Sequence, residues 1–209
     1  MVPFAVQASR GCSSPCLLAL ALAAEFAPVR PTRADRALDD LAAWLVGARA
    51  GDPVDQLDAL AELAGAHLEP VVLSSAIDDL LLDRVAAGGA GHPLLLAIAC
   101  AEAARRAGLA VGIVAGAEGA FVAHRELAEP LLVDPARGGL RDARTLEAPV
   151  SWQCCHQVAA RILTASASAP SASGRCAGRC APPSCASRCP SRRPRASAWR
   201  PMCGASGRA

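Results

Sequence analysis

The sequence predicts an α+β fold with N-terminal helices, a central helix and a small antiparallel β meander, followed by a disordered C-terminal tail. Apolar residues recur at three- and four-residue steps through residues 15 to 68, which indicates packed helices. Short apolar runs separated by turn residues follow a further helix, which indicates a meander. No Leu, Ile, Val or Phe occurs after Leu163. We therefore divide the 209 residues into an N-terminal segment, 1–14, a domain, 15–163, and a tail, 164–209.

The first part of the domain is expected to form helices over residues 14–26, 32–49, 52–68 and 74–85. In the second of these, Leu38, Leu41 and Leu45 fall at helical spacing beside Trp44. The third opens on Asp52-Pro53, a capping residue followed by Pro at the first helical position. The acidic residues of the first three of these helices are expected to face solvent.

The central helix is expected to begin at His92-Pro93, after a flexible glycine-rich stretch over 86–91. Leu95, Ile98 and Glu102 fall on one stripe of this helix, and Glu102 forms an i, i+4 pair with Arg106. After Gly108, strands are expected over 109–115, 120–124 and 131–134, with turns at 116–119 and 135–139. A helical pattern resumes over 151–163.

The charges divide between the body and the tail. All 21 basic residues are Arg, which is typical of a very GC-rich genome, and eight of them lie in residues 164–209 together with no acid. Residues 1–163 therefore hold 13 Arg against 19 acids, a net charge of −6. This balance excludes nucleic-acid binding through the body, and leaves contact of the tail with nucleic acid as an alternative.

The N-terminal residues permit two interpretations. Residues 1–27 have one Arg, an apolar run from Cys16 to Ala24 and a small-residue end, which resembles a signal peptide. The same run serves as a first core helix, with one apolar side made by Leu17, Leu18, Leu20, Leu22 and Phe26. No apolar run is long enough to cross a membrane, and we expect a cytoplasmic protein.

The tail contains cysteines but no Leu, Ile, Val or Phe that could form a core around them. Cys176, Cys180, Cys185 and Cys189 lack the paired knuckle spacing of structural zinc sites, so no metal is expected. We interpret the tail as an out-of-frame translation, because the codons CTG CGC for Leu-Arg, read one base late, begin with those for Cys-Ala. That dipeptide recurs at Cys176-Ala177, Cys180-Ala181 and Cys185-Ala186. Too few apolar side chains remain to offset the entropy of ordering the tail.

Several motifs together resemble those of the bacterial SirB family, whose N-terminal region is similar to the transglutaminase-like fold and is followed by tetratricopeptide repeats. The matching motifs are Gly91-His92-Pro93, Ala104-Arg105-Arg106-Ala107-Gly108-Leu109, Gly119-Ala120-Phe121 and Asp134-Pro135-Ala136-Arg137-Gly138-Gly139. The helices "RALDDLAAWL" and "HQVAARIL" are also similar to those of the family, so the resemblance covers about residues 15–163.

The resemblance implies where an active site would lie. A transglutaminase-like enzyme uses a Cys at a helix N-terminus, a His from one strand and an Asp from the next. Those positions fall at or beside Pro93, at Ala120 and at Asp134, so only the acid is present. The SirB family departs from the enzyme pattern at the Cys, and this chain also lacks the His.

Three other side chains are weighed as substitutes. Cys100 lies about seven residues into the central helix, roughly 10 Å along its axis, and is interpreted as a packing residue. His124 shares a strand face with Ala120 but stands about 13 Å further along, which indicates a histidine at the rim. His92 is interpreted as a cap or an exposed neighbour of the helix start, and Asp134 as a turn opener that binds backbone N–H groups.

We therefore expect a catalytically silent, SirB-like interaction or regulatory domain with a protein or peptide partner and no cofactor. The alternative is a diverged cysteine hydrolase that uses Cys100, His124 and Asp134, which requires these side chains within hydrogen-bond reach.

Overall fold

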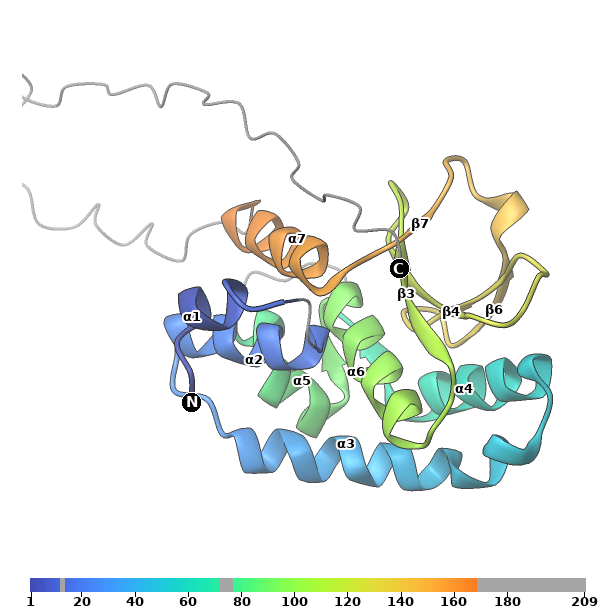
Figure 1. Ribbon diagram of the computed structural model, residues 1–209, viewed down its shortest axis with the longest axis horizontal. Helices are drawn as coiled ribbons and strands as arrows, with labels where there is room; N and C mark the ends of the chain where they lie inside the picture. Colours follow the sequence, from blue (N-terminus) through green and yellow to red (C-terminus); the bar gives the residue numbers. More distant parts are fainter. Residues whose placement is uncertain (12–13, 72–76, 169–209) are drawn as a thin grey trace, which may run out of the picture. The chain divides into compact units, whose positions relative to one another are not determined.

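The computed structural model describes residues 1–11, 14–71 and 77–168. The described residues form seven α-helices and a five-stranded antiparallel sheet, which confirms the α+β fold class (Figure 1). Residues 169–209, which include the tail cysteines, lie outside the described residues. None of the helices in the described part is long and apolar enough to cross a membrane.

The helix that begins at Pro53 follows the capping signal of the sequence. Asp52 accepts hydrogen bonds from the N–H groups of Val54 and Asp55, and Pro53 holds the first helical position, as predicted. The acids of the first three predicted helices are exposed, as predicted. The helices are α1 Phe4–Ala8, α2 Pro15–Phe26, α3 Pro31–Leu45, α4 Pro53–His67, α5 Leu82–Gly88, α6 Pro93–Arg106 and α7 Cys155–Ser168, with short 3₁₀ helices at Val46–Ala50, Ile77–Leu80 and Ala143–Thr145.

Several predicted boundaries are wrong. The α-helix predicted over 32–49 ends at Leu45 and continues as a 3₁₀ helix, and within the described part of 74–85 a 3₁₀ helix at Ile77–Leu80 precedes α5. Helix α7 continues to Ser168, five residues past the predicted end at Leu163, because Ala has the highest helix propensity and the Thr and Ser hydroxyls find acceptors within the helix. Thr164 Oγ1 donates to the carbonyl of Ala160 at 3.0 Å, and Ser166 Oγ to that of Ile162 at 2.8 Å. The glycine-rich stretch 86–91 is also ordered, since α5 runs through Gly88 and a short strand follows.

Helix α6 lies at the centre of the fold (Figure 1). It contacts α2, α3, α4 and α5 as well as strands β3 Val111–Ala115 and β4 Ala120–His124. The main core cluster combines side chains from all these elements. Ten of the fourteen residues of α6 are buried, which suits a helix covered on nearly all sides.

Helix α2 belongs to this core. Its residues Cys16 and Leu18 to Ala23 are buried, as the core-helix interpretation expected. Leu17 and Phe26 were assigned to the same apolar side, but their exposed fractions are 54% and 45%. The reason is that α2 is buried on most of its circumference, so the sequence alone does not mark which residues stay outside.

The sheet has the strand order β6-β5-β4-β3-β7. Three strands were expected, and they form β3, β4 and β5 Leu131–Asp134. Strands β6 Gly139–Asp142 and β7 Ser151–Trp152 were not expected, and the helix predicted from residue 151 begins only at Cys155. A separate parallel pair joins β1 Glu69–Pro70 to β2 Ala90–Gly91.

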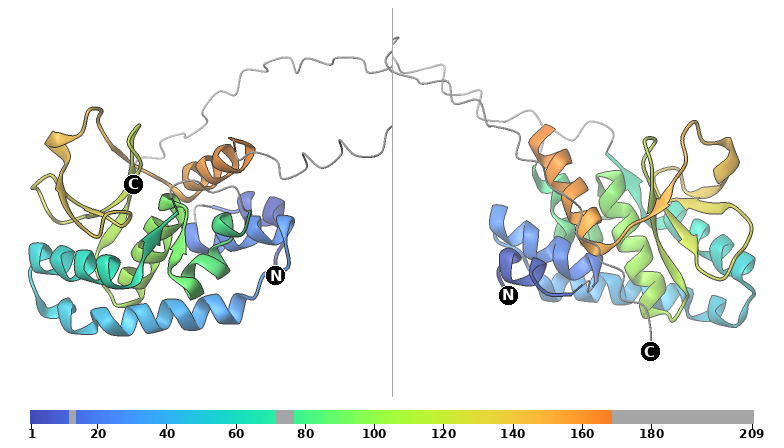
Figure 2. Two further views of the ribbon diagram at one scale, coloured as in Figure 1. Left: turned by 180° about the vertical axis from the view of Figure 1, so that it is seen from behind. Right: turned by 45° about the horizontal axis from the view of Figure 1, so that its top comes forward.

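The two faces of the sheet have different partners (Figure 2). Ile113, Ala115, Ala120, Val122 and Val133 belong to the main core with α6 and α4. The opposite face carries a smaller cluster of Val114, Phe121, Ala123 and Leu132, covered by Ala143, Leu146 and Val150. Alternation along the strands assigns each residue to one face.

Candidate functional site

The start of α6 presents no reactive group. Pro93 has no N–H, and the N–H of Leu94 donates to His92 Nδ1 at 3.2 Å. The N–H groups of Leu95 and Leu96 both donate to the carbonyl oxygen of His92, at 2.8 and 3.1 Å. The donors that would stabilise a thiolate or another anion at this helix end are therefore already used.

His92 is the N-terminal cap of α6, one of the two roles predicted for it. Its Nδ1 accepts a hydrogen bond, so the neutral ring carries its proton on Nε2. Partial burial lowers the pKa of His92 below its usual value, which favours this neutral form. The capping bond thus occupies the nitrogen that faces the helix.

A pocket of about 540 Å³ adjoins this helix start, and we call it the α6-start pocket. Its walls come from α6, from the β3–β4 turn and from α7, and the lining residues are His92, Pro93, Leu94, Ala117, Glu118, Gly119, Ala120, Arg161, Thr164 and Ala165. Pro93 and Ala120, the positions that the SirB resemblance equates with nucleophile and base, therefore line the same cavity.

The charged groups of this pocket are engaged by protein partners. Glu118 accepts hydrogen bonds from Arg141 at 2.8 Å and from the N–H of Glu147 at 2.5 Å. The hydrogen bond from the N–H of Glu147 makes the largest contribution to lowering the pKa of Glu118. Arg161 donates to the side-chain oxygen of Gln153 at 3.2 Å and to the carbonyl of Gly116 at 3.4 Å. Most of the remaining lining is apolar.

Cys100 is a packing residue, as predicted. Its exposed fraction is 0%, and burial raises the pKa of its thiol to about 12. A thiol in this state is neither ionised at neutral pH nor open to a substrate.

His124 is buried, so its predicted position at an exposed rim is wrong. Its exposed fraction is 3%, and Nε2 lies 3.0 Å from the side-chain oxygen of Gln56 on α4. Nδ1 accepts a hydrogen bond from the N–H of Glu126 at 3.2 Å. Both ring nitrogens are therefore occupied.

Asp134 opens the β5–β6 turn, as predicted. Its Oδ1 accepts a hydrogen bond from the N–H of Ala136 at 3.1 Å, and its carboxylate lies within 4.0 Å of Arg137 and Arg141. The pairing of Val122 with Val133 puts those two residues on one sheet face. By alternation, His124 lies on that face and Asp134 on the other.

The structure therefore does not bring Cys100, His124 and Asp134 together as a catalytic set. No family model, curated protein or solved structure matches the chain. The likeness to the SirB family accordingly rests on the sequence motifs. Within residues 1–11, 14–71 and 77–168, no group of three or more His, Cys, Asp or Glu side chains is placed to hold a metal ion.

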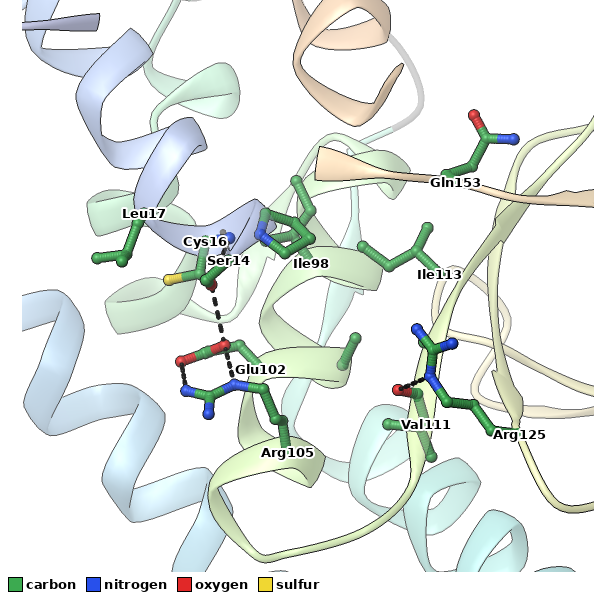
Figure 3. A pocket seen from close by; sticks show the side chains of 13 residues that line it. Ser14, Cys16, Leu17, Ile98, Glu102, Arg105, Val111, Ile113, Arg125 and Gln153 are labelled. Atoms are coloured by element: carbon green, nitrogen blue, oxygen red, sulfur yellow. Dashed lines mark hydrogen bonds and ion pairs between the residues drawn. The ribbon is translucent and has the colours of Figure 1, made fainter. Parts of the chain in front are cut away.

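A second pocket, which the sequence did not reveal, lies between α2, α6 and the edge of the sheet (Figure 3). We call it the arginine pocket; it has a volume of about 540 Å³. Its lining residues are Ser14, Pro15, Cys16, Leu17, Ile98, Ala101, Glu102, Arg105, Val111, Gly112, Ile113, Arg125 and Gln153.

One signal of this pocket was present in the sequence. Glu102 continues the buried stripe of α6, where an acid requires compensation. Arg105 donates to both of its carboxylate oxygens, at 2.9 and 2.7 Å, and Arg106 donates to Oε1 at 3.1 Å. Burial alone would raise the pKa of Glu102, but these hydrogen bonds outweigh burial and lower it.

Proposed function

We propose that the chain is a non-catalytic, cytoplasmic, transglutaminase-like domain of the SirB kind that binds a peptide segment of a partner protein in the α6-start pocket. One observation carries the proposal. Pro93 and Ala120 stand where the resemblance places the nucleophile and the base, while a cavity of ligand size remains between α6, the β3–β4 turn and α7.

The chemistry of the pocket supports binding rather than turnover. Pro93 carries no sulfur or hydroxyl to attack a substrate, and Ala120 has only a methyl group where a base would be required. The N–H groups at the start of α6 are already bonded to His92. An apolar side chain of a peptide suits the mostly apolar walls, with Arg161 at one side as a polar contact.

The alternative, a cysteine hydrolase, is tested directly with the full chain and an activated ester or anilide substrate. We expect hydrolysis no faster than in a blank and no difference between wild type and Cys100→Ala. Site-resolved alkylation provides a second measurement, because buried Cys100 is expected to react with iodoacetamide only after unfolding. Turnover abolished by Cys100→Ala would contradict the proposal.

Peptide binding is tested by selecting peptides from a display library on the immobilised full chain and titrating a synthetic peptide. Ala117 is exposed and lines the α6-start pocket, so Ala117→Trp is expected to fill it and reduce affinity at least about tenfold. Ala128→Trp is the matched control at an exposed position outside the pocket. Failure to select any peptide, or equal binding by both variants, counts against the proposal.

The acidic balance of residues 1–163 supports a protein or peptide partner for the body rather than nucleic acid. Contact of the basic tail with nucleic acid remains a separate hypothesis. It predicts salt-sensitive binding that disappears when the chain is truncated after Ser168.

A further inference from the structure

The arginine pocket holds one guanidinium group that has no acidic partner among the described residues. Arg125 takes part in no ion pair with the acids of the described residues. Glu102 and Arg105 lie on one side of the pocket, and Arg125 lies on the other (Figure 3). Within the described part of the chain these are the only charged residues that line the pocket, so their charges sum to one positive charge.

Two contacts hold Arg125 in place. Its Nε donates to the carbonyl of Val111 at 3.4 Å, and its guanidinium carbon lies 5.0 Å from the ring centroid of Trp152. A Cβ atom at Gly112 would lie 2.9 Å from one terminal nitrogen of Arg125 and 3.0 Å from Trp152, so glycine makes room for the stacked pair. Arg125 is an exposed residue, and these contacts hold its guanidinium beside the pocket, which reduces the entropy cost of binding a ligand there.

Glu102 does not neutralise Arg125, because both of its oxygens are already used. Oε1 accepts from Arg105 and Arg106, and Oε2 accepts from Arg105 and from Ser14 Oγ at 3.3 Å. Arg106 is paired in addition with Asp35 and Asp39 of α3. Both carboxylate oxygens of Glu102 are therefore occupied by hydrogen bonds from other residues of the protein.

The rest of the lining is apolar and includes Ile98, Val111 and Ile113. A planar guanidinium binds a carboxylate through two parallel hydrogen bonds, and apolar walls favour an apolar body on the same molecule. We propose that the arginine pocket binds a monocarboxylate with an apolar body, and that Arg125 pairs with its carboxylate. A free organic acid and the C-terminal residue of a peptide share this chemistry.

The test is an NMR titration of the full chain with hexanoate and, separately, with a short peptide ending in Leu with a free carboxylate. Hexanamide and the amidated peptide are the neutral controls. We expect saturable shifts of the Gly112 and Gln153 amides with at least one acid and none with its amide. Arg125→Gln is expected to weaken binding about tenfold or more, since it removes a charge-assisted hydrogen bond.

Arg137→Gln is the matched control, because it removes the same charge from an exposed side chain that does not line the pocket. Circular dichroism and thermal melting check that both variants fold. Binding of hexanoate alone identifies a free acid as the ligand, and binding of the peptide alone identifies a C-terminus. No binding of either acid, equal binding of acid and amide, or equal losses in Arg125→Gln and Arg137→Gln overturns the inference. Ala117→Trp should leave this binding unchanged, so the two proposed sites can fail separately.

Discussion

A Cβ atom at Gly138 would lie 2.5 Å from the Cα of Gly65, so helix α4 and the β5–β6 turn meet through two residues without side chains. Gly138 also has φ +63°, a left-handed conformation that non-glycine residues rarely adopt. The contact joins α4 to the β5–β6 hairpin and thereby helps to place Asp134, at the end of β5.

Gly138→Ala is expected to destabilise the domain by about 2 kcal/mol or more, because it combines left-handed strain of about 1 kcal/mol with a backbone clash. The measurement is the free energy of unfolding from urea denaturation. Gly139→Ala is the control, since a Cβ there meets nothing within 4 Å and φ is not positive. Equal losses for both variants would show that the close approach to Gly65 is not important.

Glu102→Gln is expected to lower the stability at pH 7 by about 1–3 kcal/mol, because it leaves Arg105 and Arg106 facing a neutral side chain. The lowered pKa of Glu102 means that its stabilising effect is present above the unfolded value of 4.5 and is lost as pH falls through the folded value. The difference from wild type should therefore shrink toward pH 3 in urea denaturation. Glu62→Gln, on the exposed face of α4, should change stability little at either pH.

His92→Ser tests the neutral cap of α6. The folded pKa of His92 lies below 6.5, so the unfolded state binds its proton first and stability falls as pH decreases through 6.5 toward the folded value. Serine caps a helix without titrating. Wild type should therefore lose stability relative to His92→Ser between pH 7.5 and 5.5, as measured by urea denaturation, while the other histidines contribute equally to both. Parallel pH profiles would show that the ring nitrogen does not cap the helix.

Asp83 is buried in α5, and its Oδ2 accepts a hydrogen bond at 3.0 Å from the N–H of Arg30, the residue that precedes α3. Its Oδ1 is buried and has no hydrogen-bond partner within the described part of the chain. Asp83→Ala should cost about 1–3 kcal/mol, because the N–H of Arg30 loses its acceptor. Asp83→Asn keeps an acceptor for the N–H of Arg30, so thermal melting should show a smaller loss. Equal losses would contradict this role.

The helices with local start signals were predictable from the sequence. Asp52-Pro53 and His92-Pro93 mark the first turns of α4 and α6, and their caps form as expected. Strand β6 was not predictable, because Gly139–Asp142 shows no apolar alternation and is formed by pairing with β5 around Gly138. The extension of α7 was missed because small residues carry no periodic apolar signal.

Features of the candidate sites were predictable only where they depend on the residues of a single segment of the chain. That Pro93 and Ala120 carry no nucleophilic or basic side chain, and that Cys100 is buried in α6, follows from local sequence. The burial of His124 depends on Gln56, 68 residues away. Likewise, the arginine pocket needs α2, α6 and β3 to converge, and no local pattern encodes that convergence.

Helix α7 packs on α2, and His156 Nε2 lies 3.0 Å from the carbonyl oxygen of Ala8, a contact between residues 148 positions apart. During synthesis, the apolar side of α1 and α2 that α7 covers therefore stays exposed until α7 has left the ribosome. Any premature stop before α7 should yield a nascent chain that chaperones retain or proteases remove.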